Sequence, residues 1–379
     1  MPPTTSRTAP GFWRCTGCNT PNPSASYLTK CLGCGLPIPP YSNDQPARSP
    51  STPAGPSPSL VERRGRFTLV AGAVFAVVIL TAVGLIRWWP VDGWLVGPLL
   101  LVPRWLFLVP IVPLAVGAIR SRRWLVRAVV LADLVLVLGP GMDLAVPVAR
   151  LVASPMVGSK VRVLNVDPGR WMIDGARLVG LIEKQQIDVV CFTRSVEPDG
   201  LVEPLTKSGW QFGGDHRIAS RWPIAAAPAA NSATPELAVV KLRHPDGFDF
   251  RLASVALPGP GRAVDCLRVG DLGGWRTELA SWDEQVIQLR LNLADSGTSP
   301  VIVAGDFGRP DDCQRMISLR ATYPSARQQA GWGYAGHGGD QIVASRDWSF
   351  ARFGTGPDLG TDHRPVIAEA VLNPRNRAD

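Results

Sequence analysis

The chain has 379 residues, a formal net charge of +8, 46% hydrophobic residues and 18% charged residues. This length excludes a single small module, since a domain usually holds about 100–200 residues. The charged fraction lies below the roughly 25% usual in soluble proteins and indicates a membrane portion, while seven cysteines, four of them within the first 34 residues, are too clustered for a disulfide scaffold.

The positive charge is spread unevenly along the chain. Residues 1–66 hold seven basic and two acidic side chains, which gives +5, and residues 67–159 hold seven and three, which gives +4. Residues 160–379 hold 25 basic and 26 acidic side chains, which gives −1. Since the excess flanks apolar segments, it predicts membrane orientation. A DNA partner is disfavoured because it needs clustered Lys and Arg.

The first 36 residues contain two CxxC pairs whose four thiolates can bind one tetrahedral zinc ion. These ligands are Cys15, Cys18, Cys31 and Cys34. Two disulfides or free thiols are the alternatives, and a reducing cytoplasm disfavours disulfides. Trp13 and Asn22 resemble those of the Ran-binding-protein type of zinc finger, which binds protein or RNA partners. We expect a zinc-stabilised adaptor module with an unidentified partner, followed by a Pro- and Ser-rich linker at 37–66.

Residues 67–148 contain three apolar segments, predicted as transmembrane helices at about 67–86, 105–119 and 124–148. The first has no charge over 20 residues, which matches the number that crosses about 30 Å of hydrocarbon. Arginines before the first segment and between the second and third predict a cytoplasmic N-terminus. Three crossings then place the C-terminal domain outside. The alternative for the third segment, which contains Asp133, is a buried or amphipathic helix, and this would reverse the topology.

From residue 160 onward the pattern becomes that of an α/β domain. Strands are predicted at 161–166, 187–192, 236–243, 248–257, 300–305, 341–345 and 364–372, and helices at 171–186 and 274–293. Many strands with few helices between them favour two packed sheets over one doubly wound sheet. Cys191 is expected in the core, and His244 in a solvated loop. A bridge between Cys266 and Cys313 is conceivable outside the cytoplasm.

Polar side chains lie at the ends of several of these strands. The motifs are Leu164-Asn165-Val166-Asp167, Ser220-Arg221-Trp222-Pro223-Ile224, Gly305-Asp306-Phe307, Gly339-Asp340-Gln341-Ile342 and Thr361-Asp362-His363-Arg364-Pro365. Carboxylate and amide oxygens suit a hard cation such as Mg²⁺. A carboxylate can orient a histidine, and another can position a water for attack on phosphorus.

In order and spacing, these motifs resemble the endonuclease/exonuclease/phosphatase family over residues 160–373, most specifically in the segments around Asp306 and His363. The resemblance implies a four-layered α/β sandwich, hydrolysis of phosphoester or phosphodiester bonds, and dependence on Mg²⁺ or Mn²⁺. Bacterial members with three N-terminal transmembrane helices are similar in layout. The chain is therefore expected in a bacterial inner membrane.

The resemblance also assigns roles to individual residues. It implies that Asp306 activates the attacking water, that Asp340 orients the catalytic His363, and that Asn165 contacts phosphate and metal. Asp362 would be a metal ligand, and Asp167 a second acidic group in some members.

Three positions depart from the family pattern. Arg194 stands where a metal-binding Glu is expected, Ala256 where a His is expected, and Gly308 where an Asn is expected. Glu197 is a candidate replacement ligand. Two hypotheses follow: a hydrolase with an altered, weak metal site, or a catalytically inactive member that serves as a binding or adaptor protein.

Overall fold

The computed structural model divides into two units, residues 1–59 and 60–379. It describes residues 7–9, 12–14, 21–23, 30, 34–35, 60–88, 99, 102–121, 123–147, 156–168, 173–196, 201–225, 237–259, 261–295, 299–308, 313–332, 339–361 and 363–373.

The N-terminal unit contains a small antiparallel sheet in the order β1–β2–β3. Its strands are β1 (Arg7–Ala9), β2 (Phe12–Arg14) and β3 (Pro21–Pro23). Trp13 pairs with Asn22 across β2 and β3, so the two residues that resemble the zinc-finger pattern are neighbours. Cys34 is exposed, while Cys15, Cys18 and Cys31 lie outside the described residues. Zinc binding therefore stays a prediction.

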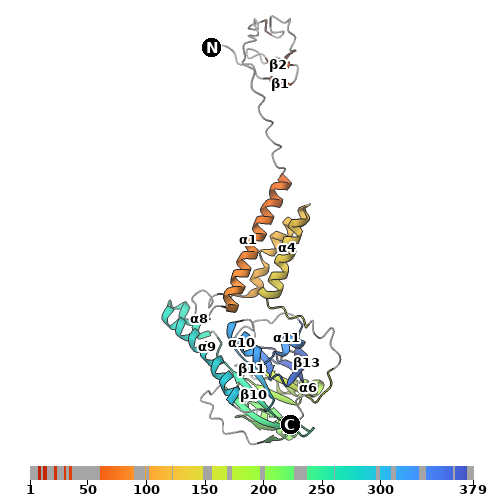
Figure 1. The fold of residues 1–379 in the computed structure, drawn as a ribbon, viewed down its shortest axis with the longest axis vertical. Coiled ribbons are helices and arrows are strands. Elements are labelled where there is room, and N and C mark those ends of the chain that lie inside the picture. The colour runs from red at the N-terminus through yellow and green to blue at the C-terminus, as the bar shows by residue number, and fades with distance from the viewer. Residues whose placement is uncertain are drawn as a thin grey trace. The chain divides into compact units, whose positions relative to one another are not determined.

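The second unit begins with a bundle of apolar helices (Figure 1). Its elements are α1 (Leu60–Trp88), the 3₁₀ helix η1 (Arg104–Leu108), α3 (Ile111–Arg120), α4 (Trp124–Leu136) and the π-helical turn η2 (Val137–Gly141). Two continuous helical segments, Gly65–Trp88 and Trp124–Gly141, are long and apolar enough to cross a membrane. The first and third predicted segments are therefore helical, although the third ends at Gly141 rather than at 148.

The second predicted segment, 105–119, is not one helix. Pro110 divides it into η1 and α3, because proline lacks the N–H that continues a helical ladder. Helix α3 alone rises only about 15 Å over its ten residues. The second segment nevertheless runs antiparallel to α1 and α4. Its end lies beside the start of α1, since a Cβ at Gly117 would meet Thr68, and its beginning lies beside the end of η2, since a Cβ at Gly141 would lie 3.9 Å from Phe107.

Asp133 faces the interior of the bundle, as its position inside an apolar segment predicts. Its side chain is 1% exposed. A Cβ at Gly72 would come within 3.0 Å of its Oδ2 atom, so this glycine lets α1 approach the carboxyl group. At the end of η2, the guanidinium of Arg327 donates to the backbone oxygen of Asp143 at 2.9 Å and pairs with its carboxylate.

Two mixed sheets form the rest of the unit. The six-stranded sheet has the order β13–β14–β4–β5–β7–β6, and the five-stranded sheet has the order β12–β11–β10–β9–β8. The strands of the first are β4 (Lys160–Val166), β5 (Val189–Phe192), β6 (Gln211–Gly213), β7 (Ile218–Ser220), β13 (Trp348–Thr355) and β14 (Val366–Leu372). Those of the second are β8 (Ile224–Ala225), β9 (Leu237–Arg243), β10 (Asp249–Ala256), β11 (Val301–Asp306) and β12 (Asp340–Ala344).

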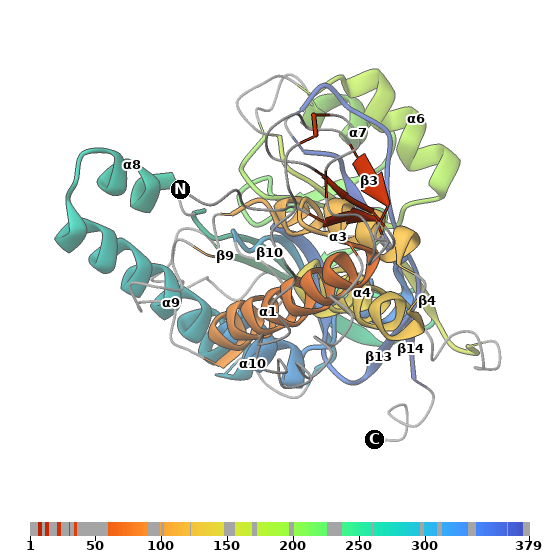
Figure 2. The ribbon, with the colours of Figure 1, turned by 90° about the horizontal axis from the view of Figure 1, so that it is seen from above.

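Helices cover the outer face of each sheet, as Figure 2 shows with α6 on one side of the strands and α9 and α10 on the other. The helices of this domain are α6 (Gly175–Gln185), α7 (Glu203–Lys207), α8 (Gly261–Arg268), α9 (Leu272–Asp295), α10 (Gln314–Thr322) and α11 (Ala326–Ala330). Side chains of α6 and α7 pack on the six-stranded sheet, and those of α9 and α10 on the five-stranded sheet. A third core fills the space between the sheets. The predicted four-layered α/β sandwich is confirmed.

Four side chains bear on individual predictions about the core. Cys191 is fully buried between the sheets, as predicted. His244 is not solvated but buried, because its ring stacks on Phe248 at a centroid distance of 4.5 Å. No disulfide joins Cys266 to Cys313, so the conceivable bridge is absent.

Candidate active site

The candidate site lies where strand ends of the two sheets meet. Asn165 and Asp167 come from the end of β4 in the six-stranded sheet, and Asp306 and Asp340 from β11 and β12 in the five-stranded sheet. Asp306 and Asp340 are direct partners in the β11–β12 register. His363 precedes β14, whose first residue pairs with Asn165. The packing of the two sheets thus brings together five of the residues that the sequence singled out.

Asn165, Asp340 and His363 form a hydrogen-bonded chain. Nδ2 of Asn165 donates to Oδ1 of Asp340 at 2.8 Å, and Nδ1 of His363 lies 2.9 Å from Oδ2 of the same carboxylate. The hydrogen bond with Asp340 raises the pKa of His363 to about 9, although burial opposes the shift. His363 is therefore protonated at neutral pH, and Asp340 holds it in place.

Asp306 is the site's best candidate for a general base. Burial raises its pKa to about 6, and repulsion from Asp340 adds to the shift, while a hydrogen bond from the backbone N–H of Gly308 at 2.7 Å opposes it. Two neighbouring groups with pKa values of about 6 and 9 are typical of an acid–base pair. Asp306 can accept a proton in the range where His363 still carries one.

Asp167 joins the site to the loop that follows β5. Its Oδ1 atom accepts a hydrogen bond from Oγ1 of Thr193 at 2.7 Å and lies 4.0 Å from Nε of Arg194. Its Oδ2 atom lies 3.8 Å from Nδ1 of His363. One buried carboxylate therefore stands between two cationic side chains.

Part of this cluster has the chemistry of a divalent-cation site. Ligand atoms of Asp167, Asp306 and His363 lie within 4.8 Å of one another, but a protonated histidine is not a ligand. Oδ1 of Asn165 is buried and has no hydrogen-bond partner among the described residues, as expected of an atom that faces a bound cation. Asp167 and Asn165 therefore offer oxygen donors of the kind that Mg²⁺ or Mn²⁺ takes, with Asp306 beside Asp167. Asp362, the predicted metal ligand, lies outside the described residues.

The structure places all three departures from the family pattern beside this cluster. Arg194 approaches Asp167, Ala256 is the partner of Asp306 in the β10–β11 register, and Gly308 donates to Asp306. Gly308 has φ +59°, and a Cβ there would lie 2.7 Å from the backbone oxygen of Pro258. An asparagine at 308 would therefore strain this turn. Glu197 lies outside the described residues.

Gly339 is required for the close approach of Asp306. A Cβ at this position would lie 2.1 Å from Oδ1 of Asp306 and 2.5 Å from the backbone nitrogen of Gly308. We expect Gly339→Ala to lower the free energy of unfolding by about 1–3 kcal/mol, because the site has no room for a methyl group. Chemical denaturation measures the change. Gly354→Ala is the matched control, since a Cβ there meets nothing within 4 Å, and equal stability of the two variants would contradict this account.

Sequence reasoning missed two residues that shape the site. Thr193 holds Asp167, and buried Arg217 donates from Nη2 to the backbone oxygen of Thr193 at 2.9 Å. His216 is half-buried in the turn that precedes β7, with φ +58°. No motif marks Thr193 or Arg217, because their partners are 26 and 24 residues away.

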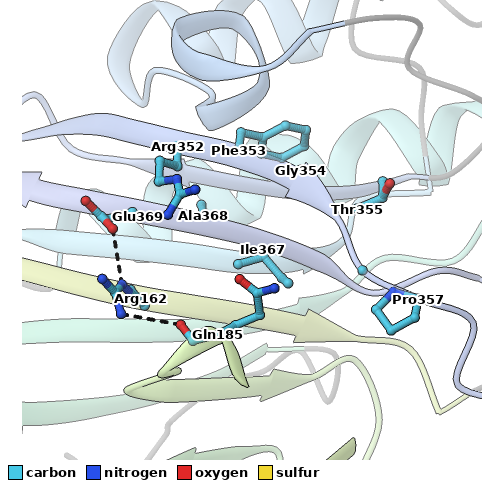
Figure 3. A pocket seen from close by; sticks show the side chains of 11 residues that line it. Arg162, Gln185, Arg352, Phe353, Gly354, Thr355, Pro357, Ile367, Ala368 and Glu369 are labelled. Carbon is cyan, nitrogen blue, oxygen red and sulfur yellow. Dashed lines mark hydrogen bonds and ion pairs between the residues drawn. The ribbon is translucent and has the colours of Figure 1, made fainter. Parts of the chain in front are cut away.

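A separate hollow of ≈ 240 Å³ lies on the outer face of the six-stranded sheet (Figure 3). Arg162, Gln185, Arg352 and Glu369 line it together with residues 353–357. Nε of Arg162 pairs with Oε2 of Glu369 at 3.1 Å. None of the five clustered site residues lines this hollow, so it is distinct from the candidate active site.

Comparison with solved structures finds chains of low sequence identity. A family protein of the endonuclease/exonuclease/phosphatase type from Bacteroides thetaiotaomicron is 13% identical, with 57% of this chain and 100% of that chain covered and a TM-score of 0.44. The human nocturnin catalytic domain with bound sulfate is 15% identical, with 57% and 97% covered and a TM-score of 0.41. A mannosyl-6-phosphatase from Bacteroides thetaiotaomicron is 13% identical, with 56% and 100% covered and a TM-score of 0.38. No protein-family model and no curated protein matches the chain. At these identities the activity must be argued from the site.

Proposed function

We propose that the chain is a membrane-anchored member of the endonuclease/exonuclease/phosphatase family that hydrolyses phosphoester or phosphodiester bonds at an altered metal site. The observation that carries the proposal is the pair formed by Asp306, with a pKa of about 6, and His363, with a pKa of about 9 and oriented by Asp340. Shifted pKa values in a cluster of buried polar side chains are typical of active sites.

The residues suggest how the reaction proceeds. Asp306 takes a proton from a water molecule as its oxygen forms a bond to phosphorus, and the bond from phosphorus to the leaving oxygen breaks. The positive charge of His363 offsets the negative charge that develops on the phosphoryl group. A divalent cation held by Asp167 and Asn165 would supply further charge stabilisation. Asp340 and Asn165 keep the ring of His363 in one orientation.

The pH dependence of hydrolysis tests this assignment. We expect kcat/KM to rise with pH through about 6, because Asp306 must lose its proton to act as a base, and to fall through about 9, because His363 must keep its own. Asp340→Asn should move the upper limb to lower pH, since it removes the hydrogen bond that raises the pKa of His363. A profile without these two limbs would contradict the proposed roles.

The proposal is tested with the purified full chain in detergent. Phosphate release from a monoester and cleavage of a diester are measured with Mg²⁺, with Mn²⁺ and with EDTA. Turnover that depends on the cation supports a hydrolase. The absence of turnover on phosphomonoesters, phosphodiesters, phosphoinositides and DNA would favour the alternative, an inactive member that binds a partner; the approach of Arg194 to Asp167 is the observation that keeps this alternative open.

The remaining segments supply location and partners. The bundle of α1, η1, α3 and α4 would anchor the chain in a bacterial inner membrane, with the N-terminus cytoplasmic and the sandwich outside. The antiparallel course of the three apolar segments supports this topology. The N-terminal module would bind zinc through its four cysteines and recruit a protein or an RNA. A reporter enzyme fused after Asp379 tests the topology, and activity confined to the cytoplasm would overturn it.

A further inference from the structure

The side chain of Arg194 extends into solvent from a firmly held loop. The backbone N–H of Thr193 donates to the oxygen of Val166 at 3.1 Å, which ties the loop to the end of β4. Arg217 holds the oxygen of Thr193 from the other side. The side chain of Arg194 is 59% exposed, whereas that of its neighbour Asp167 is 9% exposed. The loop therefore fixes the base of this arginine and leaves its charged end accessible.

Arg194 attracts Asp167 without forming a hydrogen bond to it. The 4.0 Å between Nε of Arg194 and Oδ1 of Asp167 exceeds hydrogen-bond distance. The hydrogen-bond donor to Oδ1 is Thr193, at 2.7 Å. Asp167 therefore leaves the N–H donors of the guanidinium available. Their planar arrangement matches the oxygens of a phosphoryl group.

Arg194 and His363 stand on either side of Asp167, one facing each carboxylate oxygen. An anion that enters the site meets the positive charge of Arg194, which is present whether or not a divalent cation is bound. This arrangement differs from one in which carboxylates alone face the substrate, because such a site repels phosphate until a cation has neutralised it.

We propose that Arg194 binds the phosphoryl group of the substrate directly, so that the site holds phosphate in the absence of a divalent cation. The inference rests on the proposed phosphoester substrate class. It assigns to Arg194 the charge neutralisation that a metal bound by a glutamate at this position would supply. Arg194 is then a binding residue rather than only a partner of Asp167.

The test uses the full chain in detergent with inorganic phosphate as the probe, titrated by calorimetry in EDTA and in Mg²⁺. We expect wild type to bind phosphate in EDTA and Arg194→Ala to weaken this binding about ten- to hundredfold, as expected for loss of a charged hydrogen bond. Arg194→Lys should recover part of the affinity, because it keeps the charge and loses the planar donors.

Arg268→Ala is the matched control. Arg268 is also an exposed arginine beside one aspartate, with its Nη1 atom 3.3 Å from Asp265 at the end of α8, and its loss should leave phosphate binding unchanged. Equal binding by wild type and Arg194→Ala in EDTA, or binding that appears only with Mg²⁺, would overturn the inference. Cation-dependent hydrolysis without phosphate binding in EDTA would do the same and leave the proposed function intact. A fourth outcome separates the two proposals in the other direction. If wild type binds phosphate in EDTA, Arg194→Ala weakens that binding, and no ester is hydrolysed, the inference is supported and the proposed hydrolase activity is rejected.

Discussion

Replacing Asp306 by asparagine is expected to lower kcat by about 10²–10⁴-fold, the range usual for loss of a general base. Asparagine has nearly the same shape and keeps an oxygen that can accept the hydrogen bond from Gly308. It cannot take a proton from water. The substitution also removes a buried acid whose pKa burial raises to about 6, so the folded state should gain rather than lose stability at neutral pH. Kinetics and thermal unfolding, measured together, separate the two effects.

The control for this variant is Asp249→Asn. Asp249 begins β10, at the end of the strand away from the site, and pairs with Lys241 at 2.7 Å. It should retain wild-type turnover. An Asp306→Asn enzyme with turnover within a few-fold of wild type would show that Asp306 is not the base. Loss of turnover together with loss of folded protein would instead point to a structural role.

Arg194→Glu is expected to raise the affinity for Mn²⁺ by at least about tenfold, because it exchanges a positive charge for an oxygen ligand beside Asp167. Without cation, the added carboxylate crowds a cluster that already holds Asp167, Asp306 and Asp340. The variant should therefore unfold at a lower temperature than wild type in EDTA and gain more from added Mn²⁺. Each tenfold gain in affinity adds about 1.4 kcal/mol at saturating cation.

Two further variants separate the causes of this effect. Arg194→Gln removes the cation without adding a ligand, so it should raise Mn²⁺ affinity less than Arg194→Glu does. Arg268→Glu reverses an exposed charge on α8, away from the carboxylates, and should leave the affinity unchanged. If all three variants bind Mn²⁺ alike, Arg194 does not control the metal site.

Much of the sandwich follows from hydrophobic patterning. The predicted strands at 236–243 and 300–305 appear as Leu237–Arg243 and Val301–Asp306, since runs of buried β-branched residues mark interior strands. Strand β13 was missed. Its exposed second half contains Arg352, Gly354 and Thr355, so the sequence there lacks the regular alternation of apolar and polar residues that predicts a strand. The helices α8 and α10 were also missed, because polar residues fill them and their helicity depends on packing against α9.

The acidic and histidine residues of the site were predictable because each lies at or near one end of a strand in a short motif. Resemblance supplied their order, and the β11–β12 register shows why Asp306 and Asp340 meet. The role of Gly308 was not predictable. The sequence shows only a missing asparagine, whereas the positive φ and the nearby oxygen of Pro258 explain why glycine is needed here. Restoring the family residue at this position is therefore expected to cost stability.

The origin of the site in two different sheets has a consequence for folding. Asn165 and Asp167 belong to one sheet, and Asp306 and Asp340 to the other. Neither sheet alone therefore contains a functional site. Partial unfolding that separates the sheets breaks the bond between Asn165 and Asp340 before either sheet loses its own ladder. The site therefore exists only in the fully assembled sandwich, and its activity reports the cooperativity of the whole domain rather than the integrity of any single strand.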